Sequence, residues 1–396
     1  MSVLWRQGST FQYAASIAAT WVWAPAIFVA SSMAYTSGIY GFLWFLIPNV
    51  LTLLLFGYIS SKIDTDGWNI GHVVSKAGLL QVWTHKWVST ILLMCSTVVQ
   101  FIGIYTLVHG LFGFDKDITA IGISVIALAM VWFGGIKACI ITDGFKYAIM
   151  VIVGIILACL CINNGTLNMW GNAAPSFLDV TTNFGIISAI GLLSAPYADQ
   201  TFWQRAYSIP KEKRFLTFSL AGAMFLIVPL LFGICGFMNG NQTDWTLANA
   251  FDGYTKYILF AGVLCALIST IDSNLCAFSS LYIDDLDDTY THFVEKFFML
   301  LLVCVSSIIF ISTELTIVQL FLLYGTIRTC IAMPTIMTIF NRYSEYLPYT
   351  TIGTVIGCSF GYAYMSYYLN PYAWVMTVLA LITPLLLAYE PKKMEV

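Results

Sequence analysis

Two short stretches, Trp23-Ala24-Pro25 and Ser194-Ala195-Pro196, decide how the chain folds. Each places a proline inside a long apolar segment, where proline removes a backbone hydrogen bond and interrupts a helix. The apolar segment that follows each of them carries a proline in a similar context, FLIP at 45–48 and FLIVP at 225–229. The two pairs lie five segments apart, and a unit with an odd number of crossings runs in the opposite direction when it repeats. The pattern therefore predicts two inverted repeats of five helices, with the first and sixth helices broken.

The composition identifies a membrane protein. Of the 396 residues, 59% are hydrophobic and only 9% are charged, whereas a soluble domain has about a quarter charged residues. So few charges cannot cover the surface of a soluble fold of this size. The net charge of −3 gives no reason to expect nucleic acid as a partner. The expected partners are the lipid bilayer and a small-molecule solute, and nothing in the sequence indicates the oligomeric state.

Segments of about 20 apolar residues, the length that crosses a bilayer, occur about twelve times. The expected fold class is an all-α polytopic membrane protein with the 5+5 inverted-repeat core. That core occupies residues 1–340, with repeat one at about 10–163 and repeat two at about 184–340, and residues 341–396 add two helices and a short cytoplasmic tail. The expected spans are 10–33, 38–61, 87–111, 117–135, 138–162, 184–207, 214–239, 256–283, 294–312, 315–340, 350–369 and 371–389.

The basic residues predict the orientation. With the N-terminus in the cytoplasm, only Lys116 and Lys256 of the 17 basic residues fall in outer loops. Cytoplasmic loops of membrane proteins carry the excess of Lys and Arg. We therefore expect an integral protein of the plasma (inner) membrane with both termini in the cytoplasm.

Charged residues inside the predicted spans are candidates for function, because burying a charge in a membrane is costly. The alternative for each is structural neutralisation between helices, for example of Asp272 by Arg328. An enzyme is not expected, because no metalloprotease or hydrolase motif is present, and neither is a potassium-channel filter. The charges are Asp143, Lys146, Asp199, Arg205, Asp272 and Arg328.

Three stretches resemble the sodium:solute symporter family, which includes transporters of proline, pantothenate, glucose and urea. Residues 134–143 (GGIKACIITD) are similar to its GG-x-KA-x-x-x-TD stretch. Residues 199–205 (DQTFWQR) are similar to its DQ-x-x-x-QR stretch, and residues 269–273 (STIDS) to its ST-x-DS signature. The resemblance covers roughly residues 10–340 and implies the ten-helix core of the bacterial leucine transporter. The chain resembles a short form, because the family's usual leading helix has no counterpart before residue 10.

The resemblance also implies roles for individual residues. A co-transported sodium ion is bound by backbone carbonyls and by adjacent hydroxyls of the eighth helix, and Asp143 lies on its exit path to the cytoplasm. No organic cofactor is implied. The sodium ligands implied are Ala19, Val22, Ala266, Ser269 and Thr270.

The solute is less well defined. Residues around the first helix are most similar to the urea-transporter branch, whereas residues 269–273 are closer to the proline and pantothenate type. We therefore favour urea or a similar neutral solute, ahead of proline or another amino acid. Phe202 and Trp203 are candidates for an aromatic gate. Side chains that combine an aromatic face or an amide with hydrogen-bonding capacity are the candidates for the pocket: Trp23, Gln100, Tyr197, Gln200 and Tyr324.

Two other functions remain open from the sequence. An uncoupled facilitator has the same pocket but no sodium dependence, and a non-transporting remnant of a longer symporter has no uptake at all. Sodium-dependent uptake in vesicles distinguishes the three.

Overall fold

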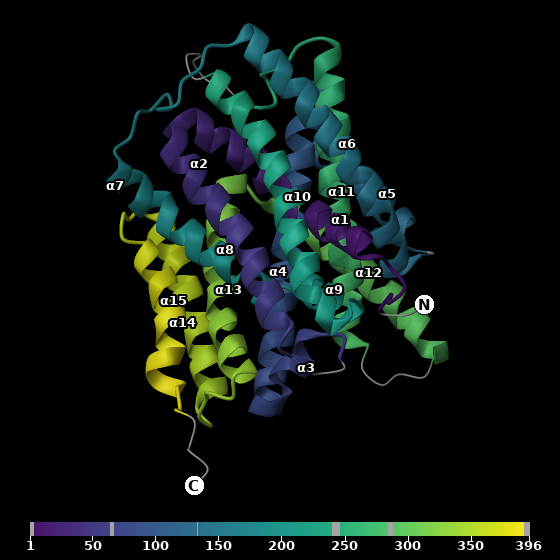
Figure 1. Cartoon of the computed structure of the whole chain (residues 1–396), viewed down its shortest axis with the longest axis vertical. Helices are drawn as coiled ribbons and strands as arrows, with labels where there is room; N and C mark the ends of the chain where they lie inside the picture. The colour runs from purple at the N-terminus through teal and green to yellow at the C-terminus, as the bar shows by residue number, and fades with distance from the viewer. Residues whose placement is uncertain (1–3, 64–66, 133, 240–245, 284–287, 392–396) are drawn as a thin grey trace.

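A computed structural model describes the chain except for residues 1–3, 64–66, 133, 240–245, 284–287 and 392–396. Most of the described residues form helices, which are shown in Figure 1. The first half of the chain forms α1 (Thr10–Trp21), α2 (Ala24–Ser60), α3 (Ile70–Val74), η1 (Ser75–Ala77), α4 (Leu79–Phe112), α5 (Lys116–Val131) and α6 (Gly135–Asn164). The second half forms α7 (Phe177–Val180), η2 (Thr181–Gly185), α8 (Ile186–Ala198), α9 (Gln200–Ser208), α10 (Lys211–Met238), α11 (Tyr254–Tyr282), α12 (Asp288–Ser312), α13 (Ile317–Ile339), α14 (Leu347–Tyr367) and α15 (Trp374–Ala388).

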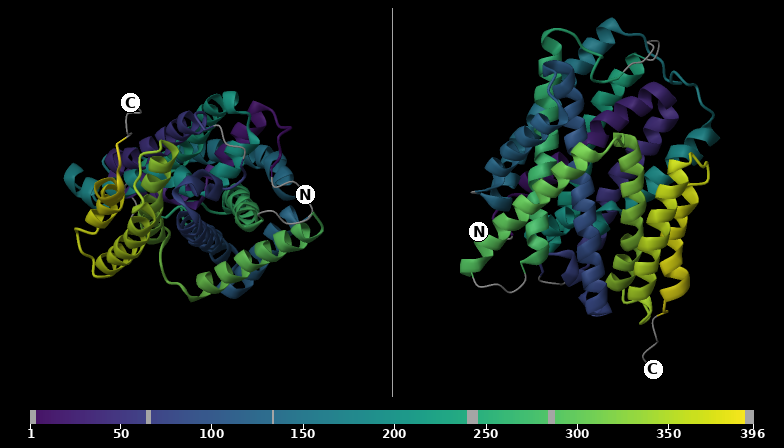
Figure 2. Two further views of the ribbon diagram at one scale, coloured as in Figure 1. Left: turned by 90° about the horizontal axis from the view of Figure 1, so that it is seen from below. Right: turned by 180° about the vertical axis from the view of Figure 1, so that it is seen from behind.

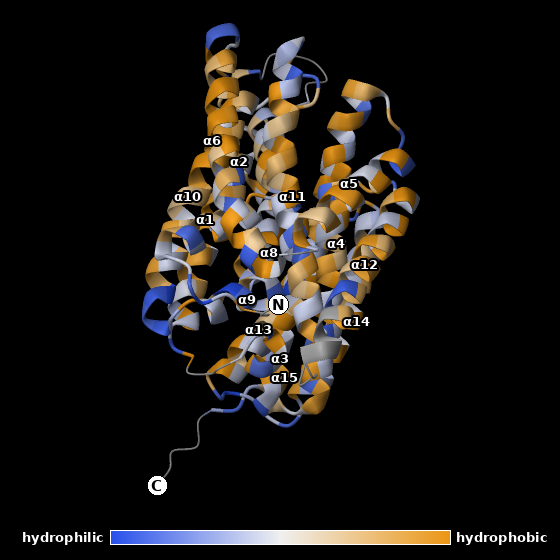
Figure 3. Ribbon diagram, turned by 90° about the vertical axis from the view of Figure 1, so that its right-hand side faces the viewer, coloured by the Kyte–Doolittle hydropathy of each residue, from blue (hydrophilic) through white to orange (hydrophobic). Residues whose placement is uncertain are grey.

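The helices have the length and hydropathy of membrane spans. Among the described residues, eight helices are long and apolar enough to cross a membrane on their own. The expected span 10–33 is divided between α1 and the first part of α2, and the expected span 38–61 forms the rest of the 37-residue α2. The expected spans at 117–135, 350–369 and 371–389 correspond to α5, α14 and α15. Figure 3 shows hydrophobic ribbon along most of the helix lengths, with hydrophilic residues gathered toward the ends and loops. The all-α polytopic fold class is confirmed.

The first helix is broken where the proline predicts. Ser9 and Gln12 form a reciprocal capping box that starts α1, which ends at Trp21. Val22 (ψ 74°) and Trp23 (ψ 178°) leave the helical conformation, and Pro25 stands in the first turn of α2, where its missing N–H has no helical partner to lose. The Oε1 atom of Gln100, on α4, accepts the N–H of Ala24, the first residue of α2, at 2.8 Å. The break is therefore stabilised by an amide from a different helix.

A glycine separates the two parts of α2 that belong to the expected spans 10–33 and 38–61. Gly38 has φ +60° and ψ −148°, so the helix bends there. A Cβ at this position would lie 2.3 Å from the carbonyl oxygen of Met169. The next residue, Ile39, donates its N–H to the same oxygen at 2.8 Å. Only glycine fits both the positive φ and the close approach of the 169–171 backbone.

The sixth helix is broken later than predicted. Pro196 lies inside α8, which continues to Ala198, and the break falls at Asp199 (φ −93°, ψ 119°). Proline removes its own N–H bond and crowds the preceding turn, but the residues after it are free to remain helical. The prediction of a break at 194–196 is therefore wrong by about one helical turn.

The packing of the helices follows the two repeats. The first helix of repeat one, α1, packs against its fifth, α6, and the corresponding α8 packs against α13 in repeat two. The second spans of the repeats, in α2 and α10, pack against each other, and so do the third spans, α4 and α11. In Figures 1 and 2, α14 and α15 lie side by side at one edge of the bundle, next to α13. The two broken helices are thus enclosed by the core.

Candidate ion and solute site

Oxygen atoms from α11 meet the end of α1 at the first helix break. The hydroxyl of Thr270 lies 3.1 Å from the carbonyl oxygen of Thr20 and 3.4 Å from that of Ala266. Ala19 belongs to the last turn of α1 and Val22 is its C-cap, where carbonyls have no intrahelical amide partner. Neutral hydroxyl and carbonyl oxygens of this kind bind alkali cations at broken membrane helices in transporters.

Asp143, on α6, is the centre of the polar network beside these oxygens. Its carboxylate is fully buried. One oxygen accepts a hydrogen bond from the hydroxyl of Ser269 at 2.6 Å, and the other accepts one from the hydroxyl of Ser16 at 2.6 Å. Asp143 thus connects the predicted sodium ligand Ser269 to the first helix.

Two buried cations balance two buried carboxylates in this network. Lys146 forms an ion pair with Asp272 and lies 3.6 Å from Asp143. Arg205 lies 3.4 Å from Asp143 and donates to the hydroxyl of Ser273 at 2.7 Å. All four charged residues are less than a tenth exposed. The cluster of Asp143, Lys146, Arg205 and Asp272, called here the four-charge cluster, has no formal net charge.

The remaining two intramembrane charges pair with each other. Arg328, on α13, donates to Asp199 at the break in the sixth helix. The hydroxyl of Tyr324 donates to both oxygens of the same carboxylate, at 3.2 and 3.1 Å. The pairing of Asp272 with Arg328, given above as an example of structural neutralisation, is therefore wrong, because Asp272 pairs with Lys146 and Arg328 pairs with Asp199.

Three of the five candidate solute residues lie together at the first helix break, and two lie elsewhere. Trp23 and Tyr324 lie together, with ring centres 5.5 Å apart, and Gln100 binds the residue after Trp23. Tyr197 packs elsewhere, against Phe56 at 5.5 Å between ring centres. Gln200 points away from this group.

Gln200 instead holds the chain between α2 and α4. Its carboxamide accepts the N–H of Ile70 at 2.8 Å and donates to the carbonyl oxygen of Trp68 at 2.8 Å. It also donates to the hydroxyl of Ser280 at 2.8 Å. The indole of Trp68 donates to the carbonyl of Ile283 at 3.0 Å. We call this set of bonds the Gln200 clamp; it ties α3 to the ends of α9 and α11.

The two gate candidates belong to one buried aromatic layer. Phe202 meets Trp21 edge to face at 5.0 Å, and Trp203 meets Phe56 at 4.9 Å. Phe218 packs on the other side of Phe56 at 5.0 Å. The layer therefore joins Trp21, at the end of α1, to the first turn of α9, which begins with Gln200.

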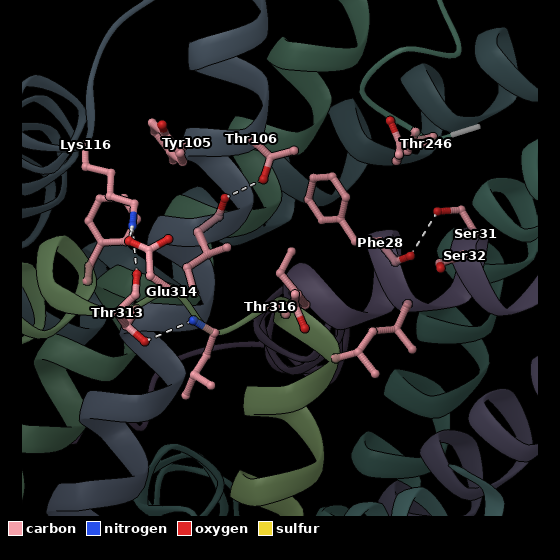
Figure 4. Close-up of a pocket in the computed structure, with 17 residues that line it drawn as sticks. Phe28, Ser31, Ser32, Tyr105, Thr106, Lys116, Thr246, Thr313, Glu314 and Thr316 are labelled. Atoms are coloured by element: carbon pink, nitrogen blue, oxygen red, sulfur yellow. Dashed lines mark hydrogen bonds and ion pairs between the residues drawn. The ribbon is translucent and has the colours of Figure 1, made fainter. Parts of the chain in front are cut away.

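A cavity of about 520 Å³ lies between α2, α4 and the α12–α13 connection. Figure 4 shows the hydroxyls that line it, and the ion pair of Lys116 with Glu314 at 3.1 Å. Its lining includes Phe28 of α2 and Val318 of α13. Phe28 is five residues beyond Trp23, which is ~7.5 Å along a helix. The cavity therefore lies about one and a half helical turns beyond Trp23 along α2.

Three hydroxyls of the network are missing from the sequence prediction: Ser16, Thr20 and Ser273. Thr20 accepts a hydrogen bond from Arg205 at 2.6 Å, and its hydroxyl lies 3.0 Å from that of Ser273. Ser16 and Thr20 are four residues apart and so occupy one face of α1. The spacing of four residues between these two hydroxyls, next to the predicted ligand Ala19, is the sequence signal that could have identified them.

The comparisons with known proteins rest on structure. No family model matches the chain, and no curated protein matches its sequence. A Na+-coupled sialic acid symporter is similar over 96% of this chain and 90% of its own, with 15% identity and a TM-score of 0.74. Mhp1, a nucleobase-cation-symport-1 family transporter, is similar over 96% and 91%, with 17% identity and a TM-score of 0.61. MhsT, solved with L-phenylalanine, is similar over 96% and 99%, with 12% identity and a TM-score of 0.58.

These similarities define the class of fold. The chain has the inverted-repeat fold of polytopic membrane transporters, and the similar structures are transporters rather than enzymes. The expected leucine-transporter-like core is therefore confirmed as a fold.

Proposed function

We propose that this protein is a sodium-coupled secondary symporter that imports a small polar solute by alternating access. The observation that carries the proposal is the group of oxygens around Thr270, which bonds to Thr20 of the broken first helix and to Ala266. The similarity in fold to a Na+-coupled symporter supports it. Sodium is the co-transported ion, held by the carbonyls of Ala19, Val22 and Ala266 and by the hydroxyls of Ser269 and Thr270. A urea-like neutral solute is favoured, followed by proline or another amino acid.

The outer cavity and the inner clamp support alternating access. With both termini in the cytoplasm, the 520 Å³ cavity opens to the outside and the Gln200 clamp faces the cytoplasm. Phe202 and Trp203 form the gate between them, and Trp23 and Tyr324 contact the solute. We assign residues 1–340 to the transport core and residues 341–396 to two accessory helices and a tail.

The experiment that tests this function is uptake into vesicles that contain the purified protein. Labelled urea, proline and other small solutes are compared with an inward sodium gradient and with potassium in its place. The proposal expects uptake of at least one solute to depend on sodium. Equal uptake in both media indicates an uncoupled facilitator, and no uptake of any solute indicates a non-transporting protein.

Asp143→Asn is expected to slow turnover more than it weakens solute binding. The change keeps the shape of the side chain, and the one oxygen of the amide accepts only one of the two hydrogen bonds that Ser16 and Ser269 donate to the carboxylate. It also removes the charge that the departing ion meets. Binding and uptake are measured in the same vesicles. Asp117→Asn, in the exposed first turn of α5, is the matched control. An equal loss of binding and uptake would contradict a role in ion exit.

The orientation is tested by labelling single cysteines in a chain without its own cysteines. Glu390 follows α15 and Asn172 lies in the connection before α7, and both are exposed. The excess of basic residues on one side predicts that Glu390→Cys is labelled only from the cytoplasm and Asn172→Cys only from outside. The reverse pattern would mean that the 520 Å³ cavity faces the cytoplasm, which reverses the proposed direction of solute transport.

A further inference from the structure

A second cavity, of about 430 Å³, lies between the ends of α13 and α15, away from the proposed transport path. We call it the α13–α15 groove. Its apolar wall includes Met333 and Ile336 of α13, Phe340 at the C-cap of that helix, and Leu385 of α15. Positions 333, 336 and 340 fall on one face of a helix and extend ~10 Å along its axis. The apolar wall is therefore about two helical turns long.

The end of α13 holds a basic residue at this groove. Asn341, with φ 52°, donates its N–H to the carbonyl oxygen of Thr338 at 3.2 Å. The next residue, Arg342, donates its N–H to the carbonyl oxygen of Met337 at 2.9 Å. This pair of bonds is a Schellman motif, in which asparagine supplies the left-handed residue. The motif fixes the backbone of Arg342, which lines the groove together with Asn341.

The charge of Arg342 has no counter-ion in the protein. Within the part of the chain that the structure describes, its guanidinium has neither an ion pair nor a hydrogen bond to a protein atom. Glu345 and Glu390, the acids nearest to the two helix ends in the sequence, are exposed and form no ion pair with it. A second base, Lys76, belongs to a neighbouring segment, because the hydroxyl of Tyr343 donates to its carbonyl oxygen at 2.8 Å. The open end of the groove therefore attracts an anion.

The apolar wall favours a lipid over a water-soluble anion. A free phosphate ion contacts Arg342 and leaves the wall uncovered, although Phe340 is 49% exposed and Leu385 is 38% exposed. A phospholipid covers both parts, because its phosphate binds a guanidinium in bidentate fashion and its acyl chain lies against apolar side chains. Basic pockets between membrane helices on the cytoplasmic side bind anionic head groups. The proposed orientation places the α13–α15 groove on that side.

We propose that the α13–α15 groove binds an anionic phospholipid, with the phosphate on Arg342 and an acyl chain along Met333, Ile336 and Phe340. Arg342 is three residues beyond the end of α13, at the level where a membrane span ends and the head groups begin. The lipid then fills the gap between α13 and α15 and supports the packing of these two helices.

The test is binding of phosphatidylglycerol to the purified full chain in detergent, measured by native mass spectrometry. Phosphatidylcholine, which has the same phosphate but no net charge, is the competitor. We expect a saturable site that prefers phosphatidylglycerol. Arg342→Gln removes the charge-assisted hydrogen bonds to the phosphate and is expected to weaken this binding about tenfold.

Two further variants separate the parts of the site. Lys213→Gln is the matched control, because Lys213 is an exposed base in the first turn of α10, outside the groove. It is expected to bind phosphatidylglycerol as the unchanged protein does. Ile336→Trp keeps Arg342 but places a larger side chain in the apolar wall, and is expected to weaken binding of the lipid. The thermal unfolding of each variant without added lipid shows whether its fold is intact.

Several results would overturn the inference. They are unchanged phosphatidylglycerol binding by Arg342→Gln, an equal loss in Lys213→Gln, and equal binding of the two lipids by the unchanged protein. Displacement of the lipid by inorganic phosphate would show that the groove binds a soluble anion instead. Lipid binding is measured without solute or a sodium gradient, so its outcome is independent of the proposed symport.

Discussion

Sodium-dependent uptake is expected to be lost when Ser269 and Thr270 are both replaced by alanine. Two of the five proposed ligands then lack an oxygen, while the cation remains desolvated between α1 and α11. Burying a charge without its ligands costs several kcal/mol, and a loss of ~3 kcal/mol raises the half-maximal sodium concentration more than 100-fold. The measurement is solute uptake as a function of sodium concentration.

The control for this variant is Ser279→Ala. Ser279 lies on the same helix, is buried, and donates its hydroxyl to the carbonyl of Cys276 in the preceding turn at 2.9 Å. It removes the same chemical group without touching the proposed ion. An unchanged sodium dependence of Ser269→Ala/Thr270→Ala, in protein that is correctly inserted, would exclude the ion site.

The second large effect is expected on stability. Lys146→Met leaves Asp143 and Asp272 with only Arg205 to balance them, in a cluster that is almost completely buried. Removing one partner of a buried ion pair destabilises a protein by about 3–5 kcal/mol. The free energy of unfolding of the purified protein measures the loss.

A double variant separates charge from packing. Lys146→Met with Asp272→Asn removes one charge of each sign, so Asp143 and Arg205 remain as a neutral pair. Most of the stability is expected to return in the double variant. If both variants lose the same free energy, the effect comes from the packing of the Lys146 side chain and not from the charge balance.

The composition and the proline positions were enough to predict the fold, for two separate reasons. The thickness of the bilayer sets the length of each apolar span. A proline cannot continue the hydrogen bonding of the helix that precedes it, so Pro25 predicts that the first helix ends just before it. The exact point of the second break was not predictable in this way. Asp199 has a partner, Arg328, that is far away in the chain, and nothing local to 194–196 records it.

The site was predictable in its parts but not in its pairings. The intramembrane charges and the hydroxyls at 269 and 270 stand out in any apolar span. The pairing of carboxylates with cations depends on how α6, α11 and α13 are shifted relative to one another along the membrane normal. The periodicity of a helix contains no information on that shift. Gln200 shows the same limit, because an amide serves a pocket or a clamp equally well until its neighbours are known.

The chemistry of the Gln200 clamp has a consequence for the proposed transport cycle, in which outward and inward states alternate. The neutral carboxamide of Gln200 makes three hydrogen bonds, worth about 1 kcal/mol each, which close the cytoplasmic side in the proposed orientation. Because the amide carries no charge, its contribution changes little with ionic strength or with pH. We therefore expect the stability of the Gln200 clamp to change little with the salt concentration or the pH. In the proposed transport cycle, the ratio of outward to inward states is then expected to depend on what occupies the centre of the molecule, and not on the salt concentration or the pH of the aqueous medium.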